Sequence, residues 1–202
     1  MSRVTPPLVT GEIYHVFNRG VDRREIFSDT HDYLRFYQSL HYFNSVDAIK
    51  NFSSARANSS SVQKRLVAFH AYALLPNHFH MLIEQKVDGG ISEFMKRITG
   101  GYTSYFNEKY TRSGVLYQGR YKRVHVSSDE QYQYLLAYVN ENQHVHKVTV
   151  PQEIMYSSSI HYQGKSKSAL LMTIQNYDFT NSKKLANDIF EKRMLTKCHL
   201  FE

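Results

Sequence analysis

Strand-like runs of hydrophobic and polar residues occur four times along this chain. A strand points successive side chains to opposite faces of its sheet, so a period of two residues predicts a half-buried strand. The predicted strands cover residues 12–20, 66–75, 78–85 and 119–128. Pro76-Asn77 separates the second strand from the third, which predicts that these two strands pair with each other.

Hydrophobic residues at helical spacing predict three helices, at residues 31–43, 91–110 and 127–143. Asp29 or Thr30 can cap the first helix, and serines followed by acidic residues suit the start of the third. Gly100-Gly101 weakens the apolar stripe of the second helix, because glycine disfavours a helix interior. The stripe consists of Ile91, Phe94, Ile98, Tyr102, Tyr105 and Phe106.

The order of these elements is strand, helix, strand, strand, helix, strand, helix. The first six follow the split βαβ order, so we predict an α+β, ferredoxin-like βαββαβ fold: an antiparallel sheet with helices on one face, followed by a further helix. We predict one domain over residues 1–162, with a mobile loop insertion at 44–65 that is rich in Ser, Asn and Ala. Residues 163–202 are expected to form a polar, partly helical C-terminal extension.

The third predicted strand carries two histidines at alternate positions. One of its faces consists of His78, His80, Leu82 and Glu84, and the other, an ordinary core face, of Phe79, Met81 and Ile83. Two imidazoles on one strand can bind one metal ion from the same side. Hydrogen-bonded histidines on a half-buried sheet are the simpler interpretation. The pattern alone is weak, because the chain has 11 histidines and repeats it at His144 and His146.

The composition gives the chain a positive net charge. The 202 residues include 25 Lys plus Arg against 18 Asp plus Glu, which gives a formal net charge of +7 and a pI near 9.3. Such a balance favours a polyanionic partner, and 14% aromatic residues suit single-stranded nucleic acid, whose bases stack on rings. Most of these rings can equally belong to the core.

Several other protein classes are disfavoured. The single cysteine, Cys198, excludes an internal disulfide and a cysteine-based zinc cluster. The N-terminus lacks the apolar stretch of a signal peptide, and no run approaches the roughly 20 apolar residues of a membrane span. We therefore expect a soluble, cytoplasmic protein with no membrane partner.

A further pair of chemical groups lies on the last predicted helix. Tyr138 and Asn142 are spaced i and i+4, so they project from the same helix face. An asparagine carbonyl can ligate a hard cation. A phenol, whose pKa is normally about 10, becomes a nucleophile when a cation or a base lies beside it. Taken singly, Tyr138 fits a packed aromatic residue and Asn142 a capping residue. Together with His78 and His80 they form a candidate site.

Six motifs follow one another in this chain: "YHVFNRGVDRREIF", "AYALLPNHFHMLIE", "FMKRITGGYTSYFN", "GVLYQGRYKRV", "LLAYVNEN" and "YSSSIHY". In these motifs and their order, the chain resembles the single-tyrosine transposases of the His-hydrophobe-His superfamily, and most closely the REP-associated group, over about residues 11–165. The motif "PNHFH" is moderately specific, and the ordered set is strong.

The resemblance implies a metal-dependent DNA strand transferase. The family's metal-binding histidines match His78 and His80, its third ligand matches Asn142, and its nucleophile matches Tyr138, which would form a 5′-phosphotyrosine. It further implies Mg²⁺ or Mn²⁺ as cofactor, single-stranded DNA hairpins from repeated or palindromic sequence as substrate, and a homodimer. The chain has "NQHVHKV" where "NP" usually follows the family's tyrosine helix.

Basic residues in these motifs are candidate phosphate contacts: Arg19, Arg23, Arg24, Lys96, Arg97, Arg120, Lys122 and Arg123. Each alone fits a solvated charge, and the cluster "RYKR" is the strongest candidate. Three other functions stay open: an inactive descendant that binds hairpins without cutting, an RNA-binding module of the same fold, and a metal hydrolase with a carboxylate base.

Overall fold

The computed structural model describes residues 6–57, 64–145 and 157–165, and further on residues 168, 170–171, 184–185 and 187–188; the side chains at 144 and 145 are not described. Most of the predicted C-terminal extension therefore lies outside the described residues, as do His146 and the middle of the predicted loop insertion, at 58–63. The domain boundary at 162 stays a prediction.

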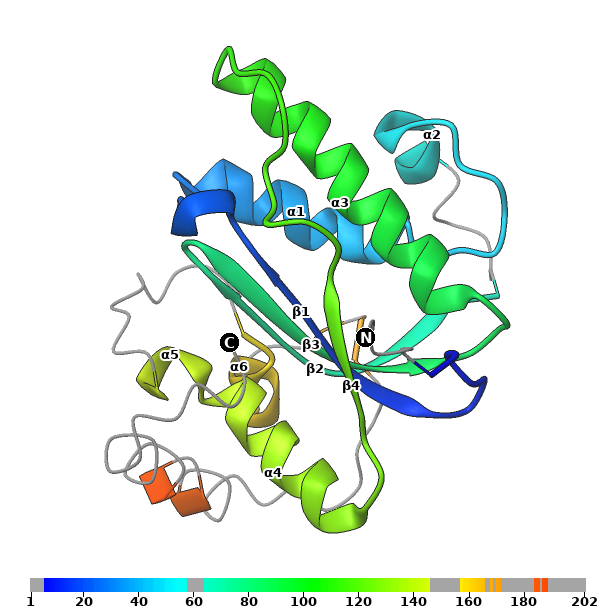
Figure 1. Ribbon diagram of the computed structural model, residues 1–202, viewed down its shortest axis with the longest axis vertical. Coiled ribbons are helices and arrows are strands. Elements are labelled where there is room, and N and C mark those ends of the chain that lie inside the picture. Colours follow the sequence, from blue (N-terminus) through cyan, green and yellow to red (C-terminus); the bar gives the residue numbers. More distant parts are fainter. Residues whose placement is uncertain are drawn as a thin grey trace, which may run out of the picture.

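Four strands form one antiparallel sheet (Figure 1). They are β1 (Ile13–Arg19), β2 (Val67–Leu75), β3 (His78–Gln85) and β4 (Lys122–His125). Their order across the sheet is β2-β3-β1-β4, and each neighbouring pair is antiparallel. With a long helix after β1 and another after β3, this is the predicted ferredoxin-like arrangement. The α+β fold class is confirmed.

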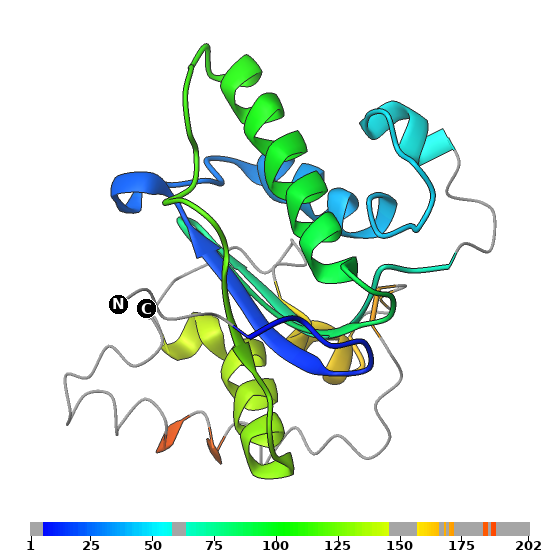
Figure 2. The same cartoon turned by 45° about the vertical axis from the view of Figure 1, so that its right-hand side comes forward.

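Helices cover both faces of the sheet, as Figure 1 and Figure 2 show. One face carries α1 (Thr30–Tyr42) and α3 (Gly90–Lys109). The other carries α4 (Asp129–Asn140), α5 (Asn142–Val145) and α6 (Ser159–Tyr162). Two short helices follow β1 and α1: η1 (Val21–Arg23) and α2 (Phe52–Ala57). Among the described helices, none has the length and apolar character needed to cross a bilayer.

The sheet face beneath α1 and α3 is the predicted core face of β3. Phe79, Met81 and Ile83 are fully buried there. The ring of Phe36 on α1 lies 5.2 Å from that of Phe79 and 5.0 Å from that of Tyr102 on α3, centroid to centroid. Burial of each such side chain stabilises the fold by roughly 1.5–3 kcal/mol, so this cluster fixes both helices on the sheet.

The opposite face packs against α4. Leu82 of β3 is buried there with three side chains of α4: Leu135, Leu136 and Val139. Ser128 caps the helix, because its hydroxyl oxygen accepts a hydrogen bond of 3.2 Å from the backbone N–H of Gln131. The helix therefore lies across the face that carries the two histidines.

The bounds of the predicted elements differ from those of the structure in three places. The strand predicted at 119–128 shortens to β4, because Gly119 has a φ of +88°, far from the extended backbone of a strand. The helix predicted at 127–143 divides into α4 and α5, because Glu141 leaves helical geometry at φ −99° and ψ 14°. Helix α2 lies within the predicted insertion at 44–65, where the sequence has no clear period.

Candidate active site

Two histidines lie side by side on β3, an internal strand of the sheet. His78 and His80 share the face that is opposite the Phe79 face. Their ring centroids are 5.1 Å apart and the rings are nearly perpendicular, at 86°. His80 is buried and His78 is half-buried. The predicted strand register is therefore confirmed.

Each of these histidines has a partner at Nδ1. The Nδ1 atom of His78 lies 2.5 Å from Oδ1 of Asn77, and an amide oxygen only accepts, so this Nδ1 carries the proton. The Nδ1 atom of His80 lies 2.9 Å from Nε2 of His15. When His15 is the acceptor, both β3 histidines keep the Nε2 lone pair. Metal-binding histidines are commonly oriented in this way, by an acceptor at the other ring nitrogen.

His15 is a residue of the site that the sequence prediction missed. It lies on β1 and is fully buried, and burial lowers the pKa of His15 to about 4. The neutral imidazole can therefore accept a hydrogen bond from His80. Strand alternation already places His15 and Phe17 on one face, but the pairing of Phe17 with His80 across β1 and β3 is what brings that face to the site.

Tyr138 lies over the histidines, on α4. Its ring centroid is 5.6 Å from that of His80 and 6.0 Å from that of His15, and the ring meets both at nearly right angles, 87° and 85°. The packing of α4 on the sheet holds Tyr138 in this position, where it is 1% exposed. The structure thus brings the predicted nucleophile next to the predicted histidine pair.

Asn142 begins α5, one helical turn beyond Tyr138. It is fully buried, and neither its Oδ1 nor its Nδ2 atom has a hydrogen-bond partner among the described residues. A buried amide without partners costs roughly 1–3 kcal/mol, so such a group calls for an explanation. An amide oxygen is a good ligand for a hard cation, and two imidazoles with an amide suit a divalent metal. The residues therefore fit the predicted metal site.

Carboxylates and cysteines do not add to this donor set. Within the described ranges, no three residues of the types His, Cys, Asp and Glu are grouped so as to hold a metal ion. The third donor would therefore be the amide of Asn142. His146 and the side chain of His144 lie outside the described residues, so the His-x-His pattern there stays untested.

The end of the tyrosine helix is held by a run of three serines. The hydroxyl of Ser157 donates to the backbone carbonyl of Asn140 at 3.0 Å, and the hydroxyl of Ser158 is hydrogen-bonded to the side chain of Asn140. Ser158 is also bonded to β2: its backbone N–H donates to the carbonyl of Tyr72 at 2.9 Å, and its hydroxyl oxygen accepts from the N–H of Tyr72 at 2.9 Å. The motif "YSSSIHY" thereby ties α4 to the sheet, a role that the sequence did not predict.

The eight candidate phosphate contacts fall into different places. Lys96 of α3 and Arg120 line one groove on the α3 side of the sheet. Lys122 pairs with Phe17 across β4 and β1, so it lies on the tyrosine side. The backbone carbonyl of Arg23 accepts a hydrogen bond of 3.3 Å from the side chain of Asn77, the residue before His78.

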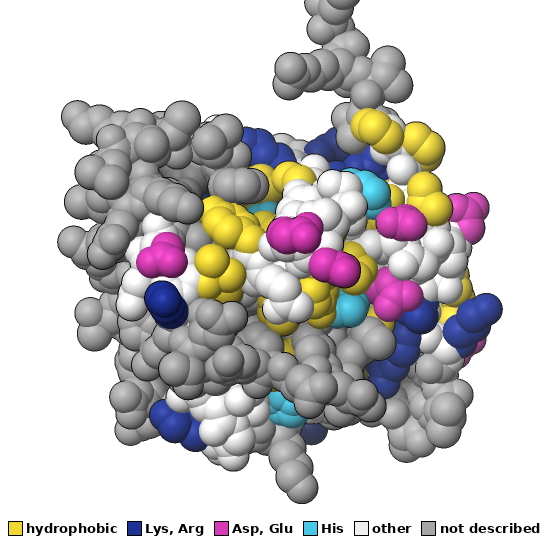
Figure 3. Space-filling model, turned by 90° about the horizontal axis from the view of Figure 1, so that it is seen from below, with side chains coloured by type: hydrophobic (Ala, Val, Ile, Leu, Met, Phe, Trp, Pro, Cys, Tyr) yellow, Lys and Arg dark blue, Asp and Glu magenta, His cyan; other side chains and the backbone are white. Residues whose placement is uncertain are grey.

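Other candidate cations are engaged within the protein. Arg97 donates to Glu93 at 2.8 Å and to the carbonyl of Ser45 at 2.7 Å. Arg19 is hydrogen-bonded to the side chain of Gln118, and Arg123 to the carbonyl of Pro6. Arg24 differs from these, because its Nε atom is buried and has no hydrogen-bond partner among the described residues. In the view from the α4 side, acidic side chains lie over the middle of the surface and basic ones toward its margins (Figure 3).

Two other tyrosines of the sequence motifs, Tyr102 and Tyr105, lie on α3, across the sheet from the histidines. Tyr102 is fully buried, its hydroxyl donates to the carbonyl of Ile26 at 2.5 Å, and burial raises its pKa. The hydroxyl of Tyr105 donates to the carboxylate of Asp32 at 3.0 Å. Both hydroxyls therefore serve packing, as their helical spacing predicts.

Comparison with known proteins gives a family match over most of the chain. Residues 9–143 match the family described as "Transposase IS200 like". The chain belongs to this family. A search of curated proteins found no match. The family assignment agrees with the resemblance that the sequence motifs indicate, and it makes the protein a DNA-processing enzyme by class.

Two solved structures of transposases are similar to this chain. One is a REP-associated tyrosine transposase bound to a REP hairpin, with 13% identity and a TM-score of 0.56, covering 86% of this chain and 99% of that one. Another is a candidate transposase from Deinococcus radiodurans R1, with 16% identity and a TM-score of 0.40, covering 70% of this chain and 97% of that one. The first of these shares the antiparallel, ferredoxin-like architecture of the IS200-like family member described here.

Proposed function

We propose that this protein is a metal-dependent transposase that cleaves and rejoins single-stranded DNA hairpins through a 5′-phosphotyrosine at Tyr138. The observation that carries the proposal is the position of Tyr138 against His80, with the amide of Asn142, which has no partner among the described residues, one turn further on. Membership of the IS200-like family supports it.

His78 and His80 would hold the cation through Nε2, and Asn142 through Oδ1. Neutralisation of charge on the scissile phosphate is the chemistry that Mg²⁺ or Mn²⁺ supplies when bound there. Mg²⁺ strongly prefers oxygen ligands, so two imidazoles favour Mn²⁺ of the two. The Nδ1 partners, Asn77 and His15, keep both rings in the orientation that this role needs.

The reaction would be an in-line displacement at phosphorus. The phenol oxygen of Tyr138 forms a bond to phosphorus, and the bond from phosphorus to the 3′ oxygen breaks. In the net reaction the phenol proton moves, through water, to the leaving 3′ oxygen, which becomes a free hydroxyl. Rejoining reverses these steps with a 3′-hydroxyl as nucleophile. Because the phosphotyrosine bond keeps the energy of the phosphoester, no nucleoside triphosphate is needed.

Access to the tyrosine requires movement. Tyr138 is 1% exposed, so a phosphate reaches it only when the side chains that cover it shift. The half-buried His78 and the nearby turn of Arg23 mark the side from which a strand would enter. The net charge of +7 is consistent with hairpin DNA as the substrate. The homodimer stays a prediction.

A covalent adduct tests the proposal. Protein incubated with end-labelled single-stranded hairpin DNA and Mn²⁺ should give a protein–DNA adduct that survives denaturing gels. Tyr138→Phe should abolish the adduct. Tyr134→Phe is the matched control, because Tyr134 lies one turn earlier on the same helix, and it should retain the adduct.

Peptide mapping should place the phosphate on Tyr138. An adduct that persists in Tyr138→Phe would contradict the assignment. Hairpin binding with no adduct under any metal condition would favour an inactive, hairpin-binding descendant instead.

A further inference from the structure

The turn that follows β1 has a strained backbone. Asp22 and Arg23 have φ angles of 55° and 58°, so two adjacent residues other than glycine lie in the left-handed region. A side chain disfavours this region, because its Cβ comes too close to the carbonyl oxygen that follows. Strain of this kind persists only where the surrounding structure holds it, and it is concentrated at functional sites.

The side chains of the strained pair do not account for the strain. Asp22 and Arg23 are both exposed, and their side chains make no hydrogen bond or ion pair with another residue that the structure describes. The left-handed geometry therefore serves the backbone groups of the turn.

Hydrogen bonds hold the turn against the tip of the β2–β3 hairpin, which lies at the same end of the sheet (Figure 1, Figure 2). The N–H of Gly20 donates to the carbonyl of Asn77 at 2.8 Å, and the N–H of Ile26 donates to the carbonyl of Pro76 at 2.8 Å. A Cβ at Gly20 would clash with the carbonyl oxygen of Arg24. The turn is therefore closed so tightly that glycine is required at this position.

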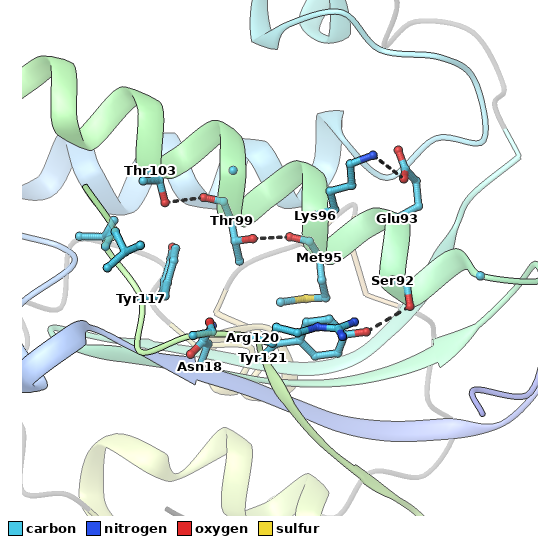
Figure 4. Close-up of a pocket in the computed structure, with 15 residues that line it drawn as sticks. Asn18, Ser92, Glu93, Met95, Lys96, Thr99, Thr103, Tyr117, Arg120 and Tyr121 are labelled. Atoms are coloured by element: carbon cyan, nitrogen blue, oxygen red, sulfur yellow. Dashed lines mark hydrogen bonds and ion pairs between the residues drawn. The ribbon is translucent and has the colours of Figure 1, made fainter. Parts of the chain in front are cut away.

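The segment after α3 holds the turn from another side. The N–H of Val21 donates to the carbonyl of Leu116 at 2.9 Å, and Gly20 forms an antiparallel bridge with Tyr117. Leu116 and Tyr117 are buried, and both line the groove beneath α3 (Figure 4). Because the hairpin and this buried segment both bind the turn, they can maintain its strained backbone.

The strained turn presents one carbonyl group to the hairpin. The carbonyl oxygen of Arg23 accepts a hydrogen bond of 3.3 Å from Nδ2 of Asn77. A carbonyl oxygen only accepts, so this contact determines which end of the amide faces the turn. The amide oxygen then faces the ring of His78, whose Nδ1 atom is 2.5 Å away.

The orientation of the Asn77 amide decides the tautomer of His78. With the amide oxygen at the ring, Nδ1 carries the proton and Nε2 keeps the lone pair that a metal needs. A reversed amide would offer an N–H group to Nδ1, which would move the proton to Nε2. It would also bring the oxygen atoms of Asn77 and Arg23 against each other.

We propose that the turn 20–24 is a positioning element for the metal ligand His78. The left-handed backbone of Asp22 and Arg23 directs the carbonyl of Arg23 at Asn77, and the amide of Asn77 sets the tautomer of His78. Arg23 thus acts through Asn77 as a positioning residue. The inference rests on the proposed function, in which His78 binds the cation.

Two substitutions at Asp22 separate backbone geometry from charge. Asp22→Val places a β-branched side chain where φ is positive, so it should force the turn into another conformation. Asp22→Gly removes the same carboxylate but tolerates the left-handed backbone, so it is the matched control. Asn77→Ala is a third variant, which leaves the sequence of the turn unchanged and removes the amide.

The tautomer of His78 is the direct measurement. Long-range proton–nitrogen NMR correlation spectra of the metal-free protein, at about pH 8 where an ordinary imidazole is neutral, show which nitrogen carries the proton. The signals of His78 are those that are missing in His78→Gln. We expect the proton on Nδ1 in the wild type and in Asp22→Gly. In Asp22→Val and in Asn77→Ala we expect protonation of Nε2 to appear.

The affinity for Mn²⁺ is the second measurement, made by calorimetry. Asp22→Val and Asn77→Ala should bind Mn²⁺ roughly 10–100-fold more weakly than the wild type, as is typical when the partner of a metal-binding histidine is lost. Asp22→Gly should bind Mn²⁺ as the wild type does.

Several results would overturn the inference. A wild type with the proton on Nε2 of His78 would do so, as would an unchanged tautomer in folded Asp22→Val. If Asp22→Val does not fold, an unchanged tautomer or an unchanged Mn²⁺ affinity in Asn77→Ala has the same meaning. Equal effects of Asp22→Gly and Asp22→Val would assign the change to the carboxylate and contradict a role for the backbone.

These measurements are independent of DNA cleavage. If the tautomer and the Mn²⁺ affinity change as expected but the wild type forms no adduct with hairpin DNA, the turn remains a positioning element and the proposed reaction is wrong. If the adduct forms on Tyr138 while all variants keep the tautomer of the wild type, the proposed reaction stands and the role of the turn is wrong.

Discussion

The Nε2 atom of His15 lies 2.9 Å from the Nδ1 atom of His80, and both rings are buried. One nitrogen of this pair must donate and the other accept. If His80 donates, its Nε2 lone pair is available to a metal, and the proton of His15 lies on Nδ1, which has no hydrogen-bond partner among the described residues. The acceptor that His15 provides on β1 therefore favours the tautomer of His80 on β3 that could bind a metal through Nε2.

Loss of the His15 acceptor should weaken metal binding. His15→Phe keeps an aromatic ring in the core but cannot accept the Nδ1 proton of His80. We expect the affinity for Mn²⁺, measured by calorimetry, to fall roughly 10–100-fold. His125→Phe is the control, because His125 lies on the edge strand and bonds to the exposed Glu12. Equal Mn²⁺ affinity in His15→Phe and the wild type would show that His15 does not contribute to metal binding.

Asn142 should show opposite effects on stability and on metal binding. Asn142→Leu replaces a buried amide, which lacks partners in the described part of the chain, by an apolar group of similar size. We expect the metal-free protein to unfold at a higher temperature, with a gain of roughly 1–3 kcal/mol, while Mn²⁺ affinity is lost. Asn142→Asp keeps the oxygen ligand, so it should destabilise the metal-free protein and retain Mn²⁺ binding. A Leu variant that binds Mn²⁺ normally would show that Asn142 is no ligand.

Loss of a structural tyrosine hydroxyl should change the stability of the protein and leave the proposed reaction at Tyr138 intact. Tyr105 and Tyr110 donate hydrogen bonds of 3.0 and 2.7 Å to the buried carboxylate of Asp32, which also accepts from Lys109 at 2.7 Å. Tyr110→Phe removes one bond to a charged group, so we expect unfolding to become easier by roughly 1.5–3 kcal/mol in a urea titration. Adduct formation with hairpin DNA should persist at temperatures where the variant is folded. Its disappearance in a folded Tyr110→Phe protein would contradict the assignment of Tyr138.

Ser158 should control the mobility of the tyrosine helix. Ser158→Ala removes the hydroxyl that joins Asn140 to the edge of β2. We expect faster amide exchange at the end of α4, followed by mass spectrometry, and a loss of roughly 1–3 kcal/mol of stability. Ser104→Ala, at an exposed position of α3, is the control. Unaltered exchange over residues 135–142 would mean that helix packing alone holds Tyr138.

The helices and strands, and the side chains that share each of their faces, follow from local sequence patterns. The two-residue period of "HFHMLIEQ" separated the histidines from Phe79, Met81 and Ile83, and the i, i+4 spacing joined Tyr138 to Asn142. These features are local, because the geometry of a single strand or helix decides which side chains share a face. The element order was enough to predict the ferredoxin-like sheet, which the strand order bears out.

Which of these faces come into contact depends on long-range packing. The register of β1 on β3 places His15 at His80, residues that are 65 positions apart in sequence. Likewise, the bonds of Ser158 to Asn140 and to Tyr72, and the groove shared by Lys96 and Arg120, depend on segments that are distant in the chain. No local period records such contacts, because they are set by strand pairing and by the packing of α3 and α4 on opposite sides of one sheet.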